Sequence, residues 1–169
     1  ARLLRRVSPA LLPWVAEAIR IVVPLRIDNE VRMSATIEEF PGLTFLSLPL
    51  DPADVAMRLV HEASHHYFLA LQRLSALHDG SDKKNYYSPI KERGRTIDMI
   101  LFAFHAFGNG ALFHRDLARR DPRFGKIAGS SVEQAISPLR ILDAYLANTP
   151  ALTAPGATLW RPIAARLLG

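Results

Sequence analysis

The stretch that most constrains this chain runs from Asp51 to Leu74. Asp51, Pro52 and Asp54 together indicate a helix start, because aspartate suits the N-cap, proline the first helical position and an acid the first turn. The residues from Val55 to Leu74 include no glycine or proline and are rich in Val, Leu, Ala, Phe and Met. We therefore expect one long, largely buried helix, against which the rest of the chain must pack.

This helix carries the pattern His-Glu-x-x-His, with His61 and His65 four residues apart and Glu62 between them. On a helix, that spacing places the two imidazoles on one face, where they can hold one divalent metal. In zinc hydrolases the glutamate of this pattern orients and deprotonates a metal-bound water. The sequence therefore predicts a metal site, and a third protein ligand should come from elsewhere in the chain.

A second apolar helix is expected from about Thr96 to Arg119, and it could supply the third ligand. It carries Asp98 and His105 seven residues apart, hence on one face. We prefer Asp98, because a carboxylate in so apolar a helix is costly unless it is paired or binds a metal. Two histidines and one carboxylate suit non-haem iron or zinc, and His105 instead would give three histidines, again compatible with either metal.

The chain as a whole favours a mainly α fold, with a zincin-like helical core and one or two short β-strands beside the His-Glu-x-x-His helix. Its 169 residues suffice for a single domain over 1–169, and the opening alanine leaves room for a longer protein of which this is a piece. Before the long helix we expect a helix at 9–23 that ends before Pro24, a hairpin or loop at 26–39 and a strand at 43–48. After it we expect a loop at 77–85. A further helix should be capped by Ser130 and Glu133 and reach about residue 147, with a kink or restart at Pro138, and a short helix should follow Trp160.

Composition excludes several classes of protein. Cysteine is absent, so the chain has no disulfide framework, thiolate metal site or cysteine nucleophile. No apolar stretch is long enough to span a bilayer, and the N-terminus does not resemble a signal peptide. The formal charge is +5, but the basic residues are spread along the sequence without interleaved aromatic residues. We expect a cytoplasmic protein without a nucleic-acid or membrane partner; the sequence does not indicate the oligomeric state.

Several short motifs occur in order between Pro41 and Leu117, namely L-S-L-P-x-D-P, V-H-E-A-x-H, Y-Y-S-P, and R-x-x-D before an apolar helix. This order resembles a family of His-Glu-x-x-His proteins found with ribosomally made, post-translationally modified peptides. The resemblance implies a peptide β-hydroxylase that depends on iron(II) and 2-oxoglutarate, with His61 and His65 as iron ligands. It also implies that Arg95 and the stretch from Tyr87 to Pro89 line the site.

The distal carboxylate of 2-oxoglutarate would need a cation, and an arginine can bind a carboxylate through two parallel hydrogen bonds. Arg95 is the first candidate, followed by Arg93 and Lys91, with Tyr87 beside them. The expected function is therefore an iron(II)/2-oxoglutarate-dependent oxygenase that hydroxylates a side-chain β-carbon of a precursor peptide.

Two alternatives remain open. One is a zinc-dependent peptidase, with Glu62 as general base and Tyr86 or Tyr87 at the oxyanion. The other is a non-catalytic peptide-binding module that keeps the helix but uses no metal. Spacing alone does not decide between iron and zinc.

Overall fold

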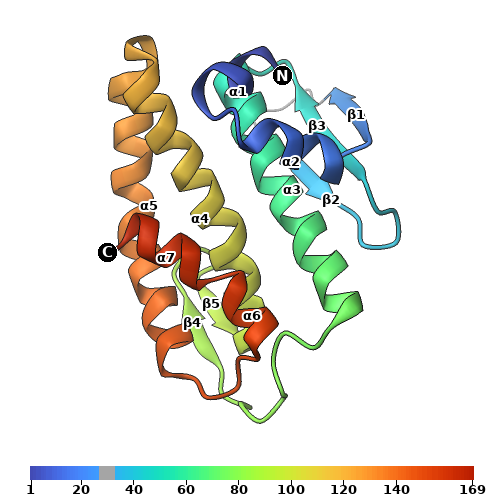
Figure 1. Ribbon diagram of the computed structural model, residues 1–169, viewed down its shortest axis with the longest axis vertical. Helices are drawn as coiled ribbons and strands as arrows, with labels where there is room; N and C mark the ends of the chain where they lie inside the picture. Colours follow the sequence, from blue (N-terminus) through green and yellow to red (C-terminus); the bar gives the residue numbers. More distant parts are fainter. Residues whose placement is uncertain (27–32) are drawn as a thin grey trace.

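The computed structural model describes residues 1–26 and 33–169 and shows a mainly helical protein with short strands (Figure 1). The mainly α class is confirmed, although five strands rather than one or two are found in the described part. In chain order the elements are α1 (Arg2–Val7), α2 (Leu11–Ala18), β1 (Ile21–Arg26), β2 (Ser34–Thr36), β3 (Leu43–Leu48), α3 (Pro52–Leu74), β4 (Tyr86–Ser88), β5 (Arg93–Arg95), α4 (Ile97–Arg120), a 3-10 turn (Pro122–Phe124), α5 (Gly125–Asn148), α6 (Ala154–Thr158) and α7 (Arg161–Leu167).

Helix α3 is the long helix expected around the motif. The Asp51 carboxylate accepts hydrogen bonds from the N–H groups of Ala53 at 2.8 Å and Asp54 at 3.0 Å. Pro52 occupies the first helical position. A side-chain cap of this kind contributes about 1 kcal/mol to stability. The predicted start of this helix and its end at Leu74 are both confirmed.

Helix α4 packs between α3 and α5, and two hydrophobic cores fix this arrangement. One core lies mainly between α4 and α5 and contains the fully buried Phe104 and Leu139. The other joins α1, α2 and α3 to the last turns of α4 and contains Leu4, Val60 and Phe113. Burying one such side chain contributes about 1.5–3 kcal/mol. The cores therefore hold α3 and α4, which carry the predicted metal ligands, in a fixed relation.

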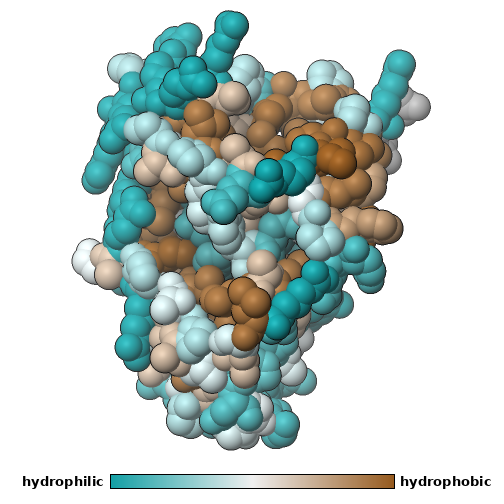
Figure 2. Space-filling model, turned by 45° about the vertical axis from the view of Figure 1, so that its right-hand side comes forward, coloured by the Kyte–Doolittle hydropathy of each residue, from teal (hydrophilic) through white to brown (hydrophobic). Residues whose placement is uncertain are grey.

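A three-stranded sheet in the order β1-β3-β2 lies beside α3. Strand β1 runs parallel to β3, and β2 runs antiparallel to it with Ala35 opposite Phe45. The strand predicted at residues 43–48 is thus confirmed, and it is the central one. Ile21 and Val22 of the outer strand β1 are exposed. Figure 2 shows apolar residues gathered at the upper right of the molecule.

The helix expected over residues 9–23 is only partly correct. Helix α2 ends at Ala18, and residues 21–26 form strand β1 with Pro24 inside it. Ile21, Val22 and Val23 are β-branched, which favours a strand once a neighbouring strand is available. Proline lacks an N–H group but is tolerated on an outer strand. The apolar spacing alone did not distinguish this short strand from the end of a helix.

The third long helix begins earlier than expected. Helix α5 starts at Gly125, so Ser130 and Glu133 lie inside it and the predicted capping box is wrong. The real start follows Asp121, which heads the 3-10 turn that leads into α5. Pro138 lies within α5, and the helix continues past it to Asn148 without a restart.

The connections were predicted with mixed success. Part of the hairpin or loop predicted at 26–39 lies outside the described residues, and the described part contains β2. The irregular stretch at 77–85 and the helix after Trp160 are confirmed. The two-stranded ribbon of β4 and β5, with Tyr86 opposite Arg95, was not predicted.

Basic residues that are far apart in the sequence meet at one end of the molecule. Helix α1 packs on the last turns of α4, Arg6 forms an ion pair with Asp121, and Ser8 Oγ donates to Asp116 at 2.7 Å. Residues 1–8 and 115–126 hold eight basic and two acidic side chains, whereas the rest of the sequence holds thirteen basic and fourteen acidic ones. The net positive charge is therefore concentrated at this end rather than scattered.

Candidate metal site and its groove

His61 and His65 face each other on adjacent turns of α3. Their Nε2 atoms are 3.1 Å apart, and their rings meet edge to face with centroids 4.6 Å apart. Two imidazole nitrogens bound to one ion at about 2.1 Å, in adjacent coordination positions, lie about 3 Å apart. The observed spacing therefore fits one metal ion. The same distance also allows a hydrogen bond from one ring to the other.

Both imidazoles are uncharged at neutral pH. Burial, followed by the nearby charges of Lys91 and Arg58, lowers the pKa of His61 to about 4. Burial, followed by the neighbouring His61, lowers the pKa of His65 to about 3. Because the neutral imidazole is the metal-binding form, the pair can take up a metal at pH 7 without first losing protons.

Two phenylalanines of α4 enclose the pair. Phe102 stacks on the His65 ring with centroids 4.1 Å apart, and Phe107 meets the His61 ring edge to face at 5.0 Å. His65 Nδ1 is buried without a hydrogen-bond partner among the residues that the structure describes. Metal-bound histidines normally donate this second N–H to an acceptor. The surroundings of His65 therefore support a bound metal only in part.

The described residues do not bring a third ligand to this pair. Within 1–26 and 33–169, no group of three or more His, Cys, Asp and Glu side chains is placed to hold a metal ion. Asp98 lies in the first turn of α4, half-buried, where a carboxylate also stabilises the helix start. His105 Nδ1 lies 3.1 Å from the backbone oxygen of Ser64 instead.

Glu62 is 2% exposed, and its carboxylate is bonded to the outer strand β2. Thr36 Oγ1 donates to Glu62 Oε2 at 2.8 Å, and the Ser34 hydroxyl also hydrogen-bonds to this carboxylate. Burial raises the pKa of Glu62, while these hydrogen bonds act in the opposite direction. The motif glutamate thus holds β2 against α3, a role that the sequence did not suggest.

Within residues 1–26 and 33–169, no strand pairs with the outer edge of β2, beside the histidines. The N–H of Ser47 donates to the Met33 oxygen at 2.8 Å, so Met33 and, two residues on, Ala35 are the positions that bond to β3. Backbone groups alternate in direction along an antiparallel strand. The N–H and C=O groups of Ser34 and Thr36 therefore point away from β3, where a further strand could pair with them.

Two cavities meet at His61 and form one groove along α3. The first, of about 380 Å³, is lined by β2, His65, Lys91 and Phe102. The second, of about 450 Å³, is lined mainly by residues of α3, α4 and α5, where Met57 and Phe107 lie beside the polar Arg58 and Gln134. Both include Ser34, His61 and Glu62. The groove therefore has one cation in each cavity, Lys91 in the first and Arg58 in the second, and His61 lines both.

Among the four side chains predicted to bind the cofactor, Lys91 lines the groove. Arg93 and Arg95 lie in β5 and Tyr87 in β4, and none of these three lines either cavity. Arg58 was missed by the sequence analysis, although it lines the 450 Å³ cavity. Its position three residues before His61 on the same helix was the available signal.

Comparison with known proteins adds no relative: no family model matches the chain, and no curated protein matches it. The resemblance to the peptide-associated His-Glu-x-x-His family therefore stays a prediction from the spaced motifs. None of the helices in the described ranges is both long and apolar enough to cross a membrane.

The burial of Glu62 predicts a pH dependence of stability. Because its pKa is raised in the folded state, ionisation of this carboxylate disfavours folding, and the penalty develops as pH rises through that pKa. Glu62→Gln removes the charge but keeps an oxygen that can accept from Thr36. We expect the variant to gain stability relative to the parent protein between pH 4 and pH 7, as measured by urea unfolding in EDTA. A relative loss over that interval would contradict this account.

Proposed function

We propose that this protein binds an extended peptide in the groove and hydroxylates one of its side chains with iron(II) and 2-oxoglutarate, in a zincin-like helical core. The observation that carries the proposal is the uncharged His61–His65 pair, whose Nε2 atoms lie 3.1 Å apart at the groove. When bound, iron(II) and 2-oxoglutarate supply the oxidising chemistry, in which O₂ yields a hydroxylated product, succinate and CO₂. A bidentate cosubstrate would itself fill two coordination positions.

The chain's own residues would then bind and orient the two substrates. Lys91, in the 380 Å³ cavity that also includes both histidines, offers a charge for the distal carboxylate of 2-oxoglutarate. The free edge of β2 offers backbone groups at Ser34 and Thr36 to an extended peptide. Phe102 and Phe107 pack on the histidine rings and limit the access of water to them.

The test is an anaerobic titration of the protein with iron(II) and 2-oxoglutarate, followed by visible absorption. We expect a charge-transfer band that requires both components and disappears in His61→Ala and His65→Ala, because each variant removes one of the two nitrogens. His78→Ala, in the loop after α3, is the matched control and should keep the band. A protein that binds iron(II) but never gives the band with 2-oxoglutarate would exclude the proposal.

Lys91→Ala tests the position of 2-oxoglutarate separately. Losing one charge-assisted contact costs about 1.5–3 kcal/mol, so the concentration of 2-oxoglutarate needed for half of the band should rise roughly tenfold or more. Arg93→Ala, on β5 outside both cavities, is the control and should leave this concentration unchanged. Equal effects of the two variants would show that Lys91 does not bind 2-oxoglutarate.

A non-catalytic peptide-binding module is the second candidate, and a specific observation favours it. The described residues provide neither a third ligand nor an acceptor for His65 Nδ1. With hydrogen on Nε2, His65 can instead donate to His61, so that its buried Nδ1 carries no hydrogen and needs no acceptor. Peptide binding that persists in EDTA and in His61→Ala, without any metal-dependent product, would establish this candidate.

A zinc peptidase has less support. The Glu62 carboxylate is bonded to the hydroxyls of Thr36 and Ser34. Tyr86 Oη donates to Asp82 at 2.5 Å, which raises the pKa of Tyr86 to about 12 and occupies its hydroxyl. Tyr87 is 55% exposed on β4. The predicted base and the predicted oxyanion donors are therefore engaged elsewhere or turned to solvent.

A further inference from the structure

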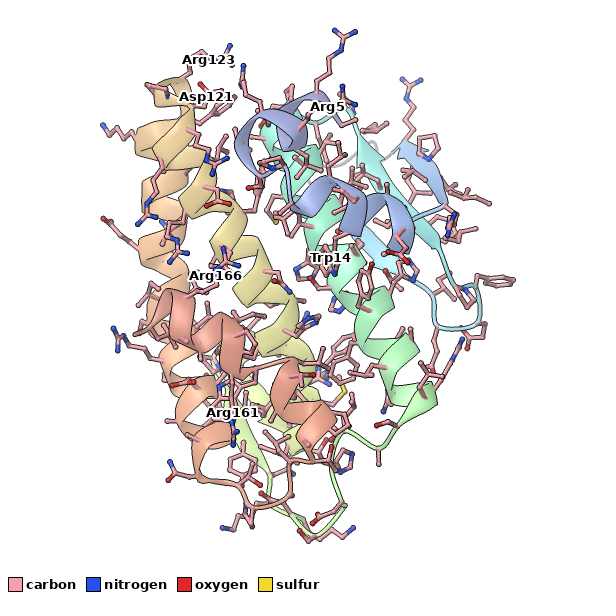
Figure 3. The ribbon with its side chains drawn as sticks, viewed as in Figure 1. Arg5, Trp14, Asp121, Arg123, Arg161 and Arg166 are labelled. Atoms are coloured by element: carbon pink, nitrogen blue, oxygen red, sulfur yellow. The ribbon has the colours of Figure 1, made fainter. Side chains whose placement is uncertain are left out.

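A third cavity, separate from the two that form the groove, lies on the opposite side of α4. The groove is lined on α4 by Phe107, Gly110 and His114, whereas this cavity is lined by His105 and Asn109 on the other side of the helix. It has a volume of about 290 Å³ and adjoins a further cavity of about 240 Å³. Leu112 of α4 also lines the 290 Å³ cavity, and the rest of its lining comes mainly from α2, α6 and α7 and includes Leu11, Trp14, Ile163 and Arg166. Figure 3 shows Trp14 on α2 and Arg166 on α7.

The lining of this cavity includes a hydrogen-bond acceptor from His105. His105 is 6% exposed, and its Nδ1 lies 3.1 Å from the Ser64 backbone oxygen. Because a carbonyl oxygen only accepts, Nδ1 carries the hydrogen and Nε2 keeps its lone pair. Nε2 has no partner in the part of the chain that the structure describes. Nε2 is not among the fully buried polar atoms that lack a partner, so it is open to the cavity and can accept a hydrogen bond from water or a ligand.

Asn109 adds a second acceptor one turn further along α4. Its Nδ2 donates to the His105 oxygen at 2.9 Å and to Ser64 Oγ at 3.2 Å. This assigns the amide orientation, because the backbone oxygen of His105 must accept. The Asn109 Oδ1 atom is thereby left to accept from something else, on the same face of the helix as His105.

Close packing of α7 on α4 brings a cation to the same cavity. A methyl group at Gly108 would lie 2.5 Å from Ile163 Cγ2, so the glycine permits this close approach of the two helices. Ile163 and Arg166 of α7 both line the cavity. The cavity thus combines acceptors on α4, a guanidinium on α7 and apolar walls.

We propose that this cavity binds a small zwitterion, a free α-amino acid with an aliphatic side chain. Its ammonium group donates to His105 Nε2 and Asn109 Oδ1, which can both accept a hydrogen bond. Its carboxylate pairs with the Arg166 guanidinium in a charge-assisted bond. Its side chain lies against Trp14 and Ile163. This site is separate from the histidine pair and does not depend on the function proposed for the groove.

The experiment is calorimetric titration of the full chain with L-leucine as the probe. N-acetyl-L-leucine lacks the ammonium group and L-leucinamide lacks the carboxylate, so each should bind roughly tenfold more weakly or worse, because each loses a charged hydrogen-bonding group. Absence of L-leucine binding at millimolar concentration, or equal binding of all three compounds, would overturn the proposal.

Two variants and two controls locate the site. His105→Asn keeps an N–H that can donate to Ser64 but removes the Nε2 acceptor, and Arg166→Gln removes the cation; each should weaken L-leucine binding about tenfold. Arg161→Gln, on the same helix but outside the cavity lining, should not change it (Figure 3). His61→Ala should also leave L-leucine binding unchanged, which separates this site from the groove. Unaltered binding in both His105→Asn and Arg166→Gln would place the amino acid elsewhere.

Discussion

Phe102→His is expected to raise the zinc affinity of the His61–His65 pair roughly a hundredfold, which corresponds to about 3 kcal/mol. The Phe102 ring stacks on His65 with centroids 4.1 Å apart and lines the same cavity as both histidines. A histidine at this position of α4 would bring a third imidazole to a pair that already has the spacing of two ligands. Competition with a chromophoric chelator measures the affinity directly.

Two controls make the result specific. Phe102→Leu removes the ring without adding a ligand and should show no gain. In the double variant Phe102→His with His61→Ala, the gain should disappear, because two imidazoles again remain. If Phe102→His binds zinc no more tightly than the parent protein, the α4 side chain at this position is not directed at the metal. If the parent protein already shows three protein ligands in its cobalt spectrum, another residue completes the site.

The signals that predicted α3 are local, which is why they succeeded. Asp51 and Pro52 act within the first turn of the helix, and the four-residue spacing of His61 and His65 determines their relative position on any helix. The central strand β3 was likewise evident from its own composition, between a turn signal and a proline.

The choice of the third ligand depended on information that the sequence does not contain. Asp98 and His105 were correctly expected on one face of a helix, but nothing local states which face of α4 meets His61 and His65. The hydrophobic cores decide that orientation, and they turn His105 to the Ser64 backbone and place Phe102 beside His65. A buried polar side chain in an apolar helix signals a partner without saying which partner.

Contacts between distant segments account for the other differences. The bond between Glu62 and Thr36 joins α3 to a strand of three residues that has no clear pattern of its own. The cluster of basic residues exists because α1 packs on the end of α4, where Arg6 meets Asp121. In each case the individual residues were visible in the sequence, but their proximity results from the packing of the whole chain.

Gly156→Ala should lower the free energy of unfolding by about 3 kcal/mol, as measured by urea denaturation. A methyl group at this position would lie 2.0 Å from the backbone oxygen of Leu77, which cannot rotate away as a side chain could. The same oxygen accepts from the Thr153 N–H at 3.2 Å, so the start of α6 is bonded to the segment after α3. The better helix propensity of alanine offsets only about 1 kcal/mol of the clash.

Gly129→Ala is the matched control, because this glycine lies in α5 and a methyl group there meets no atom within 4 Å. It should raise stability by up to about 1 kcal/mol through helix propensity alone.

The Gly156 variant also separates the two proposed sites. Displacing α6 disturbs α7, which carries Arg166, so L-leucine binding should fall, whereas the groove between α3 and β2 does not include this segment. Loss of the iron(II)/2-oxoglutarate band together with L-leucine binding would mean that Gly156→Ala unfolds the whole domain rather than its C-terminal part.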